Sequence, residues 1–182
     1  EVLGGYAAVL SIVLGVAMLG NAVGTVLYPR LCAAYAVSAY ELRRTVRATF
    51  RLLILAGVAA ATLFAFVNPV VLATYGRLPQ GAGRAASIAA LALLPMLVQP
   101  AYGYALTAMR REREVLVCTA AGLALSVLCY CVLVPTAGLV GAAWALVVSQ
   151  TVLTALPAAW VELRHFRTLA GADPQVAITG TG

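Results

Sequence analysis

Residues 43 to 51 hold four arginines, and guanidinium groups at this density can bind phosphate. They are Arg43, Arg44, Arg47 and Arg51. Apolar residues recur among them every three to four positions, which is typical of an amphipathic helix lying along lipid headgroups. Ser38 followed by Glu41 predicts the start of this helix. Two roles remain open: an anchor attracted to anionic headgroups at about 1 kcal/mol per arginine, or a gate or contact to a phosphorylated lipid substrate.

A second polar group, Asn21, lies inside a long apolar stretch. It falls between Gly20 and Gly24, which are spaced as G-x-x-x-G. Small residues at this spacing allow two helices to approach closely. The motif therefore predicts helix packing, and Asn21 either accompanies that packing or lines a polar cavity.

The stretch LLPMLVQPAYGYAL combines Pro95 and Pro100 with the polar residues Gln99, Tyr102 and Tyr104. Each proline removes one backbone hydrogen bond, so we expect a kinked helix. A carbonyl freed in this way is tolerated in a membrane only against protein, water or a cavity. The stretch is thus either a structural kink or a mobile, cavity-lining helix whose polar contacts are Gln99, Tyr102 and Tyr104.

Motifs for other chemistry are missing from the sequence. The cysteines, which form no C-x-x-C, are Cys32, Cys118, Cys129 and Cys131, and the single histidine is His165. No phosphate loop, nucleophile elbow or paired acids occur either. We expect no enzyme activity, no metal site, no cofactor and no nucleic-acid partner.

Composition indicates the class of protein that must position these residues. Of 182 residues, 63% are hydrophobic and 10% are charged, with a mean hydropathy of +0.98. Soluble domains carry roughly 25% charged residues. The chain is therefore predicted to be an all-α integral membrane protein whose main partner is the lipid bilayer.

The apolar runs are each about 20 residues long, which is the length of a membrane-spanning helix. We predict five spans, an interfacial helix and a disordered C-terminal tail. The spans are residues 6–28, 52–75, 86–108, 115–134 and 138–162, the interfacial helix is 38–51, and the tail is 168–182. Together, residues 1–167 are expected to form one transmembrane unit. The first residue is Glu1 rather than Met, so we also expect the chain to be a fragment.

Charge predicts the orientation of these spans. The basic residues are all arginines, and ten of the twelve fall on one side of the predicted spans. Only Arg77 and Arg84 fall on the other side. By the positive-inside rule, the N-terminus faces out, and the interfacial helix and the C-terminus face the cytoplasm.

The order of these features resembles that of the polysaccharide-biosynthesis or lipid-linked oligosaccharide flippases, which share a fold with multidrug and toxin extrusion carriers. The stretch GGYAAVLSIVLGVAMLGNAVGTVLYPRL is similar to a family span that ends in "fPrl", here at Arg30 and Leu31. VVLATYG and VPTAGLVGAAWALVVSQ resemble two further family motifs. The resemblance runs from Glu1 to about Arg167, and its strength is the order of the motifs.

The resemblance implies a bacterial plasma-membrane flippase that works by alternating access between two helical lobes. Its substrate would be a polyprenyl-pyrophosphate-linked saccharide, and an N-terminal lobe of the same protein would precede this chain. Family members often carry a cavity arginine three residues after the first tyrosine, but Val9 follows Tyr6 at that spacing here. Either the other lobe supplies the cation or the substrate is not a pyrophosphate. Arg30 and the arginines of residues 43–51 are the nearest cations in this chain.

Two alternatives remain open beside this interpretation. One is a multidrug or cation antiporter of the same fold, although no Asp, Glu, Lys or Arg lies in the middle of a predicted span. The other is a membrane scaffold subunit that transports nothing and needs no cavity. The scaffold predicts that Gln99→Leu leaves function intact.

Overall fold

The computed structural model describes residues 2–74 and 81–166, and every element in them is a helix. The predicted tail at residues 168–182 and the side chain of Arg77 lie outside the described residues. The elements are α1 (Val2–Val37), α2 (Ala39–Thr74), α3 (Ala82–Leu91), α4 (Leu93–Ala108), α5 (Glu112–Trp160) and the π-helix η1 (Val161–Phe166). The predicted all-helical class is confirmed for the described part of the chain.

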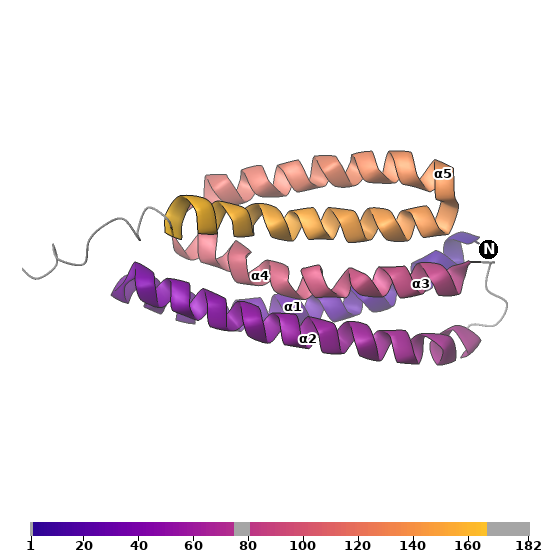
Figure 1. Ribbon diagram of the computed structural model, residues 1–182, viewed down its shortest axis with the longest axis horizontal. Coiled ribbons are helices and arrows are strands. Elements are labelled where there is room, and N and C mark those ends of the chain that lie inside the picture. The colour runs from indigo at the N-terminus through magenta and orange to yellow at the C-terminus, as the bar shows by residue number, and fades with distance from the viewer. Residues whose placement is uncertain (1, 75–80, 167–182) are drawn as a thin grey trace, which may run out of the picture.

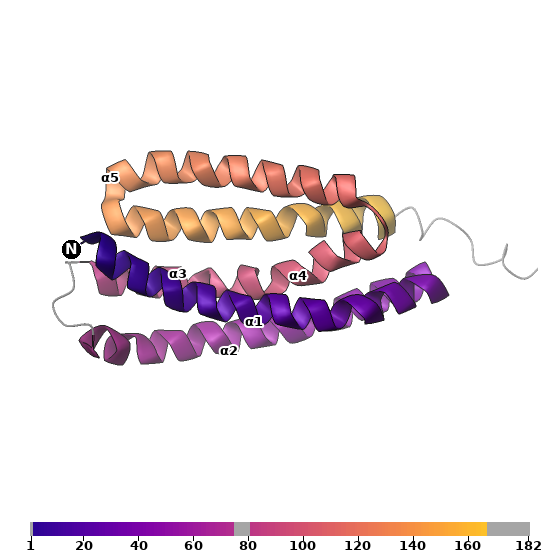
Figure 2. The ribbon, with the colours of Figure 1, turned by 180° about the vertical axis from the view of Figure 1, so that it is seen from behind.

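The helices form three layers, with α3 and α4 in the middle (Figures 1 and 2). α1 and α2 pack on one side of this central layer, and α5 packs on the other. In the central stretch Gly83–Ala108, 72% of an apolar segment of membrane-spanning length is buried. In the stretch Tyr40–Val67 of α2, only 11% of such a segment is buried. The middle layer therefore contacts protein on most sides, whereas the outer helices keep large apolar surfaces exposed.

Three stretches of the described residues are long and apolar enough to cross a membrane. They are Tyr40–Val67, Gly83–Ala108 and Glu112–Leu163. The last of these reverses direction at Gly138, where φ is 55° and ψ is −129°, a conformation that favours glycine. It therefore forms two antiparallel legs (Figure 1).

Small residues bring the two legs of α5 together. A Cβ atom at Gly141 would overlap the carbonyl group of Leu133. A Cβ atom at Gly122 would overlap the side chain of Leu153. Ala142 and Ala143 are also buried, and Ala143 packs against the central layer in a cluster with α3. The second leg thus uses small residues on two faces, one toward each neighbour.

The structure shows no break between the predicted interfacial helix at 38–51 and the predicted span at 52–75. α2 is one continuous helix from Ala39 to Thr74. No glycine or proline occurs between residues 39 and 56, so nothing in the sequence interrupts the backbone at residue 51. The predicted start is confirmed, because the Ser38 hydroxyl accepts a hydrogen bond of 3.1 Å from the Glu41 amide.

The expected span at 86–108 consists of two helices that meet at Ala92. Pro95 lies in the first turn of α4, where its missing amide hydrogen would be unpaired in any helix. Pro100 lies inside α4, which continues past it to Ala108. The interruption therefore falls at Ala92, about one turn before Pro95, and α4 continues through both prolines.

A polar cleft and a basic surface

A cleft of about 380 Å³ opens where α1, α4 and α5 meet. Its lining residues are Asn21 from α1, Gln99, Pro100, Gly103, Tyr104 and Thr107 from α4, and Val115 from α5. Three of the residues that the sequence indicates as polar contacts, Asn21, Gln99 and Tyr104, therefore come together at one site. We call this site the polar cleft.

Gly103 keeps the polar cleft open. A Cβ atom built at this position would have no heavy atom within 4 Å. Any side chain here would thus extend into the cleft instead of into a neighbouring helix. Thr107, one turn later, donates its hydroxyl hydrogen to the Gly103 carbonyl at 3.0 Å and keeps oxygen lone pairs available.

The Tyr104 ring is fixed by its contacts with α1. It packs against Tyr28 at a centroid distance of 5.9 Å and an interplanar angle of 52°. A Cβ at Gly24 would overlap the Tyr104 ring and would lie 2.9 Å from Pro100, while a Cβ at Gly20 would lie 3.1 Å from Leu97. The predicted close approach through G-x-x-x-G is confirmed, and its neighbour across the contact is α4.

A smaller cavity of about 90 Å³ extends the polar cleft between α4 and both legs of α5. The two spaces share Gln99, Gly103 and Val115. The smaller one is also lined by Leu106, Cys118, Thr119, Leu153 and Pro157. None of the residues lining either space is charged, so the site offers amide, phenol and hydroxyl groups beside apolar surface. Such a set can hydrogen-bond and stack but holds no fixed counter-charge.

Tyr102 lies on a different side of α4. Its side chain is 5% exposed and packs edge-on against Phe50 at a centroid distance of 5.3 Å. It belongs to an apolar cluster that includes Leu42 and Val46 of α2. Tyr102 therefore joins α4 to α2, and it is not among the residues that line the polar cleft.

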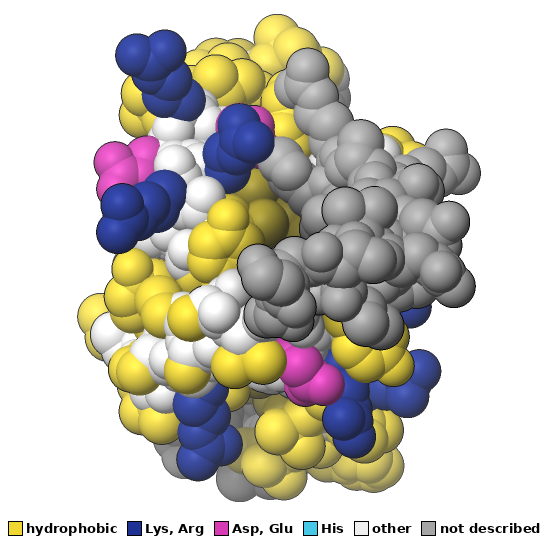
Figure 3. All heavy atoms as spheres, turned by 90° about the vertical axis from the view of Figure 1, so that its left-hand side faces the viewer, with side chains coloured by type: hydrophobic (Ala, Val, Ile, Leu, Met, Phe, Trp, Pro, Cys, Tyr) yellow, Lys and Arg dark blue, Asp and Glu magenta, His cyan; other side chains and the backbone are white. Residues whose placement is uncertain are grey.

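The second site is a hollow of about 360 Å³ on α2, which we call the basic surface. It is lined by Tyr40, Arg43, Arg44, Arg47, Ala48 and Arg51. Figure 3 looks onto the end of the molecule where α2 begins, and arginine and acidic side chains lie there among apolar ones. Arg30, on α1, is exposed and lines neither site among the described residues.

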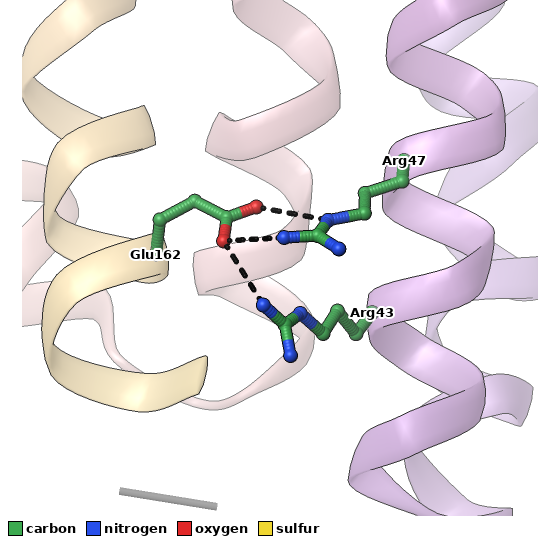
Figure 4. Close-up of polar contacts among 3 residues, drawn as sticks. All are labelled: Arg43, Arg47 and Glu162. Carbon is green, nitrogen blue, oxygen red and sulfur yellow. Dashed lines mark hydrogen bonds and ion pairs between the residues drawn. The ribbon is translucent and has the colours of Figure 1, made fainter. Parts of the chain in front are cut away.

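Glu162 faces the basic surface from the start of η1 (Figure 4). Arg47 donates to both of its carboxylate oxygens, from Nη2 at 3.1 Å and from Nε at 3.4 Å. The guanidinium of Arg43 lies 3.7 Å from the same carboxylate, and Arg44 pairs instead with Glu41 at 3.7 Å. These contacts join the first turns of α2 to η1, and Arg47 and Glu162 are 115 residues apart in the sequence.

The sequence interpretation missed the role of Glu162. The available signal was that Glu162 is the only charged residue within the five predicted spans, at the very end of the last one. An acid at the end of a span, in a chain whose basic residues collect at the same end, indicates an interhelical ion pair.

No group of three or more possible metal ligands occurs among the described residues. Comparisons with protein-family models, curated proteins and solved structures found no significant match to this chain. The function of the two sites therefore has to be inferred from their own geometry.

Proposed function

We propose that this chain is a five-span part of a transporter that moves lipid-linked saccharides across the bacterial plasma membrane. The polar cleft is the observation that carries the proposal. Polar groups that face lipid are costly, so polar side chains within membrane helices face a neighbouring helix or a cavity and often mark a substrate path. Here Asn21, Gln99 and Tyr104 gather around one opening, and Gly103 keeps it free.

The chemistry of the polar cleft suits a saccharide. Sugar hydroxyls both donate and accept hydrogen bonds, and the amides of Asn21 and Gln99 can do the same. The Tyr104 ring supplies an apolar face for the C–H groups of a sugar, while its hydroxyl supplies a polar edge. The uncharged lining is less suited to a cationic drug, which would favour a carboxylate or an open aromatic cage.

We propose that the arginine-rich end of the molecule faces the cytoplasm. The junctions α1–α2 and α4–α5 and the helix η1 all lie at this end (Figures 1 and 2). Of the arginines in the described residues, only Arg84 lies near the opposite end, close to the start of α3. The positive-inside rule supports this orientation.

We further propose that a second helical lobe covers the polar cleft and that the two lobes alternate access. Asn21 is exposed in this structure although it lies within a long apolar helix. A covering lobe would shield it from lipid. The interruption of the central layer at Ala92, together with Pro95 and Pro100, gives the wall of the cleft a place to bend.

Transport can be tested in proteoliposomes that contain a lipid-linked oligosaccharide, with its appearance at an outside probe as the signal. Gly103→Leu should fill the cleft and slow appearance by at least about tenfold, which corresponds to about 1.4 kcal/mol in the barrier. Gly15→Leu is the matched control, because a Cβ there also meets no atom within 4 Å but Gly15 does not line the cleft.

Two results would contradict the proposal. Wild-type vesicles that expose no more saccharide than empty vesicles would exclude this transport activity. If the wild-type protein transports and the Gly103→Leu and Gly15→Leu variants have equal transport rates, the polar cleft is excluded as the path.

A further inference from the structure

A separate inference concerns the basic surface of α2 and does not depend on the proposed transport function. Four arginines line this hollow, and the acidic residues that pair with them are Glu41 and Glu162. Arg43 and Arg47 share the single carboxylate of Glu162, so two positive charges face one negative charge there. The surface therefore keeps a net positive charge, which attracts an anion.

The arginines of the basic surface continue into an apolar strip on the same side of α2. Arg44, Arg51, Leu55 and Val58 are separated by seven, four and three residues, which places them on one face of a helix. All four are exposed, and Leu55 and Val58 are 68% and 48% exposed. The opposite face, with Leu42, Val46 and Leu53, is buried. One face of α2 is thus basic at its start and apolar from about one turn after Arg51.

This order of charge and apolar surface matches the order of groups in an anionic phospholipid. We propose that the basic surface binds the phosphate headgroup of such a lipid, with its acyl chains along Leu55 and Val58. The phosphate would accept hydrogen bonds from the guanidinium groups of Arg44 and Arg51. A free phosphate ion would use the arginines but would gain nothing from the apolar strip.

Glu162 would act as an internal competitor at this site. Its carboxylate already accepts two hydrogen bonds from Arg47 and lies 3.7 Å from Arg43. A phosphate held by Arg44 and Arg51 would lie in the same hollow as Arg43 and Arg47, whose positive charge Glu162 partly neutralises. The strength of lipid binding and the contact between α2 and η1 are therefore coupled through the charge of this hollow.

Lipid binding can be measured directly on the purified protein by native mass spectrometry. Phosphatidylglycerol is added as the anionic probe and phosphatidylcholine as the zwitterionic one, in a neutral detergent. The double variant Arg44→Gln and Arg51→Gln should bind phosphatidylglycerol roughly 25-fold more weakly, the effect of two lipid-facing charges. The control pair Arg110→Gln and Arg113→Gln removes the same charge from the same end of the molecule and should bind as wild type does.

Three outcomes would overturn the site. One is equal weakening by the two pairs, because it would indicate attraction to overall charge. Another is binding of phosphatidylcholine as tightly as phosphatidylglycerol, because the site would then have no preference for an anionic lipid. The third is displacement of phosphatidylglycerol by millimolar inorganic phosphate, because the apolar strip would then contribute nothing.

The role of Glu162 has its own test in the same measurement. Glu162→Gln removes the competing charge and should strengthen phosphatidylglycerol binding by roughly fivefold. Unchanged or weaker binding would contradict the competition, while the lipid site itself is judged by the arginine variants. Circular dichroism of each variant establishes that its helices are intact.

Discussion

Gly24 and Gly103 lie on facing helices at the polar cleft and have opposite effects on it. Gly24 lets α1 approach the Tyr104 ring and Pro100, whereas Gly103 leaves space that no other atom fills. The same residue type therefore closes one part of the contact between α1 and α4 and opens another. What distinguishes the two positions is the neighbour that a Cβ atom would meet.

The contact at Gly24 gives a prediction about stability. Gly24→Ala should lower the free energy of unfolding by about 1–3 kcal/mol, because the added methyl group overlaps the Tyr104 ring and lies close to Pro100. Gly15→Ala should be neutral or stabilising by up to about 1 kcal/mol, because it gains helix propensity and meets no atom. The two values are measured by unfolding the protein in mixed micelles of increasing denaturing detergent.

The two alanine variants share the same change in backbone entropy, so their difference reports the contact alone. If both variants have the same stability, α1 does not pack against α4 through Gly24. The position of Tyr104 in the cleft would then lose its support.

Residue type indicated candidates for polar contacts but left a packing or kink role open beside a cavity role. Asn21, Gln99 and Tyr104 line the polar cleft. Tyr102 does not, because two residues along a helix turn the side chain by about 200°. Tyr102 and Tyr104 therefore cannot share one face. The contact between Glu162 and the arginines was not predictable from spacing, since it depends on how helices far apart in sequence pack.

At the scale of the helices, the contact between α4 and α5 includes a polar link at the bend. The Thr154 hydroxyl lies 2.9 Å from the carbonyl of Pro95 on α4 and 2.9 Å from the carbonyl of Gln150 on its own helix. Its single hydrogen can serve either acceptor. The bend in the central layer is thereby attached to the second leg of α5.

Thr154→Val tests this link, because valine has the same shape and no hydroxyl. We expect a loss of about 0.6 kcal/mol in unfolding free energy, the average for a hydrogen bond between membrane helices. Thr151→Val is the control, because the Thr151 hydroxyl bonds only the Val147 carbonyl of its own helix, at 2.7 Å. Equal losses in the two variants would show that the bond to Pro95 adds nothing.

The sequence predicted the existence of the helices better than their limits. The hairpin of α5 was predictable because Gly138 follows a proline-containing turn and small residues follow it. The continuity of α2 was not predicted, since hydropathy changes sharply near residue 51 while helix propensity does not. Hydropathy indicates where a helix enters lipid, but backbone propensity decides where it ends.

At the scale of the whole molecule, a buried central layer is held between two outer layers with apolar surfaces (Figure 1). The outer apolar surfaces are consistent with contact to lipid. Composition predicted helices apolar enough to span a membrane, and three stretches of the described residues meet that description. The layer order was not predictable, because it depends on interhelical contacts such as those of Gly24 and Tyr102.

The central claim is that water reaches the polar cleft between α1, α4 and α5 and that the substrate path runs through it. It can be tested with single cysteines in a chain whose four native cysteines are replaced by alanine. Gly103→Cys places a thiol in the cleft, Gly15→Cys places one on the exposed surface of α1, and Arg44→Cys places one at the charged end. A membrane-impermeant maleimide, which reacts with thiolates in water, is applied to sealed vesicles of both orientations.

We expect Arg44→Cys to react only in inside-out vesicles, in agreement with a cytoplasmic charged end. Gly103→Cys should react in at least one vesicle orientation, and Gly15→Cys in neither. Failure of Gly103→Cys to react in both orientations, while Arg44→Cys reacts, would contradict a water-accessible cleft and the transport path proposed through it.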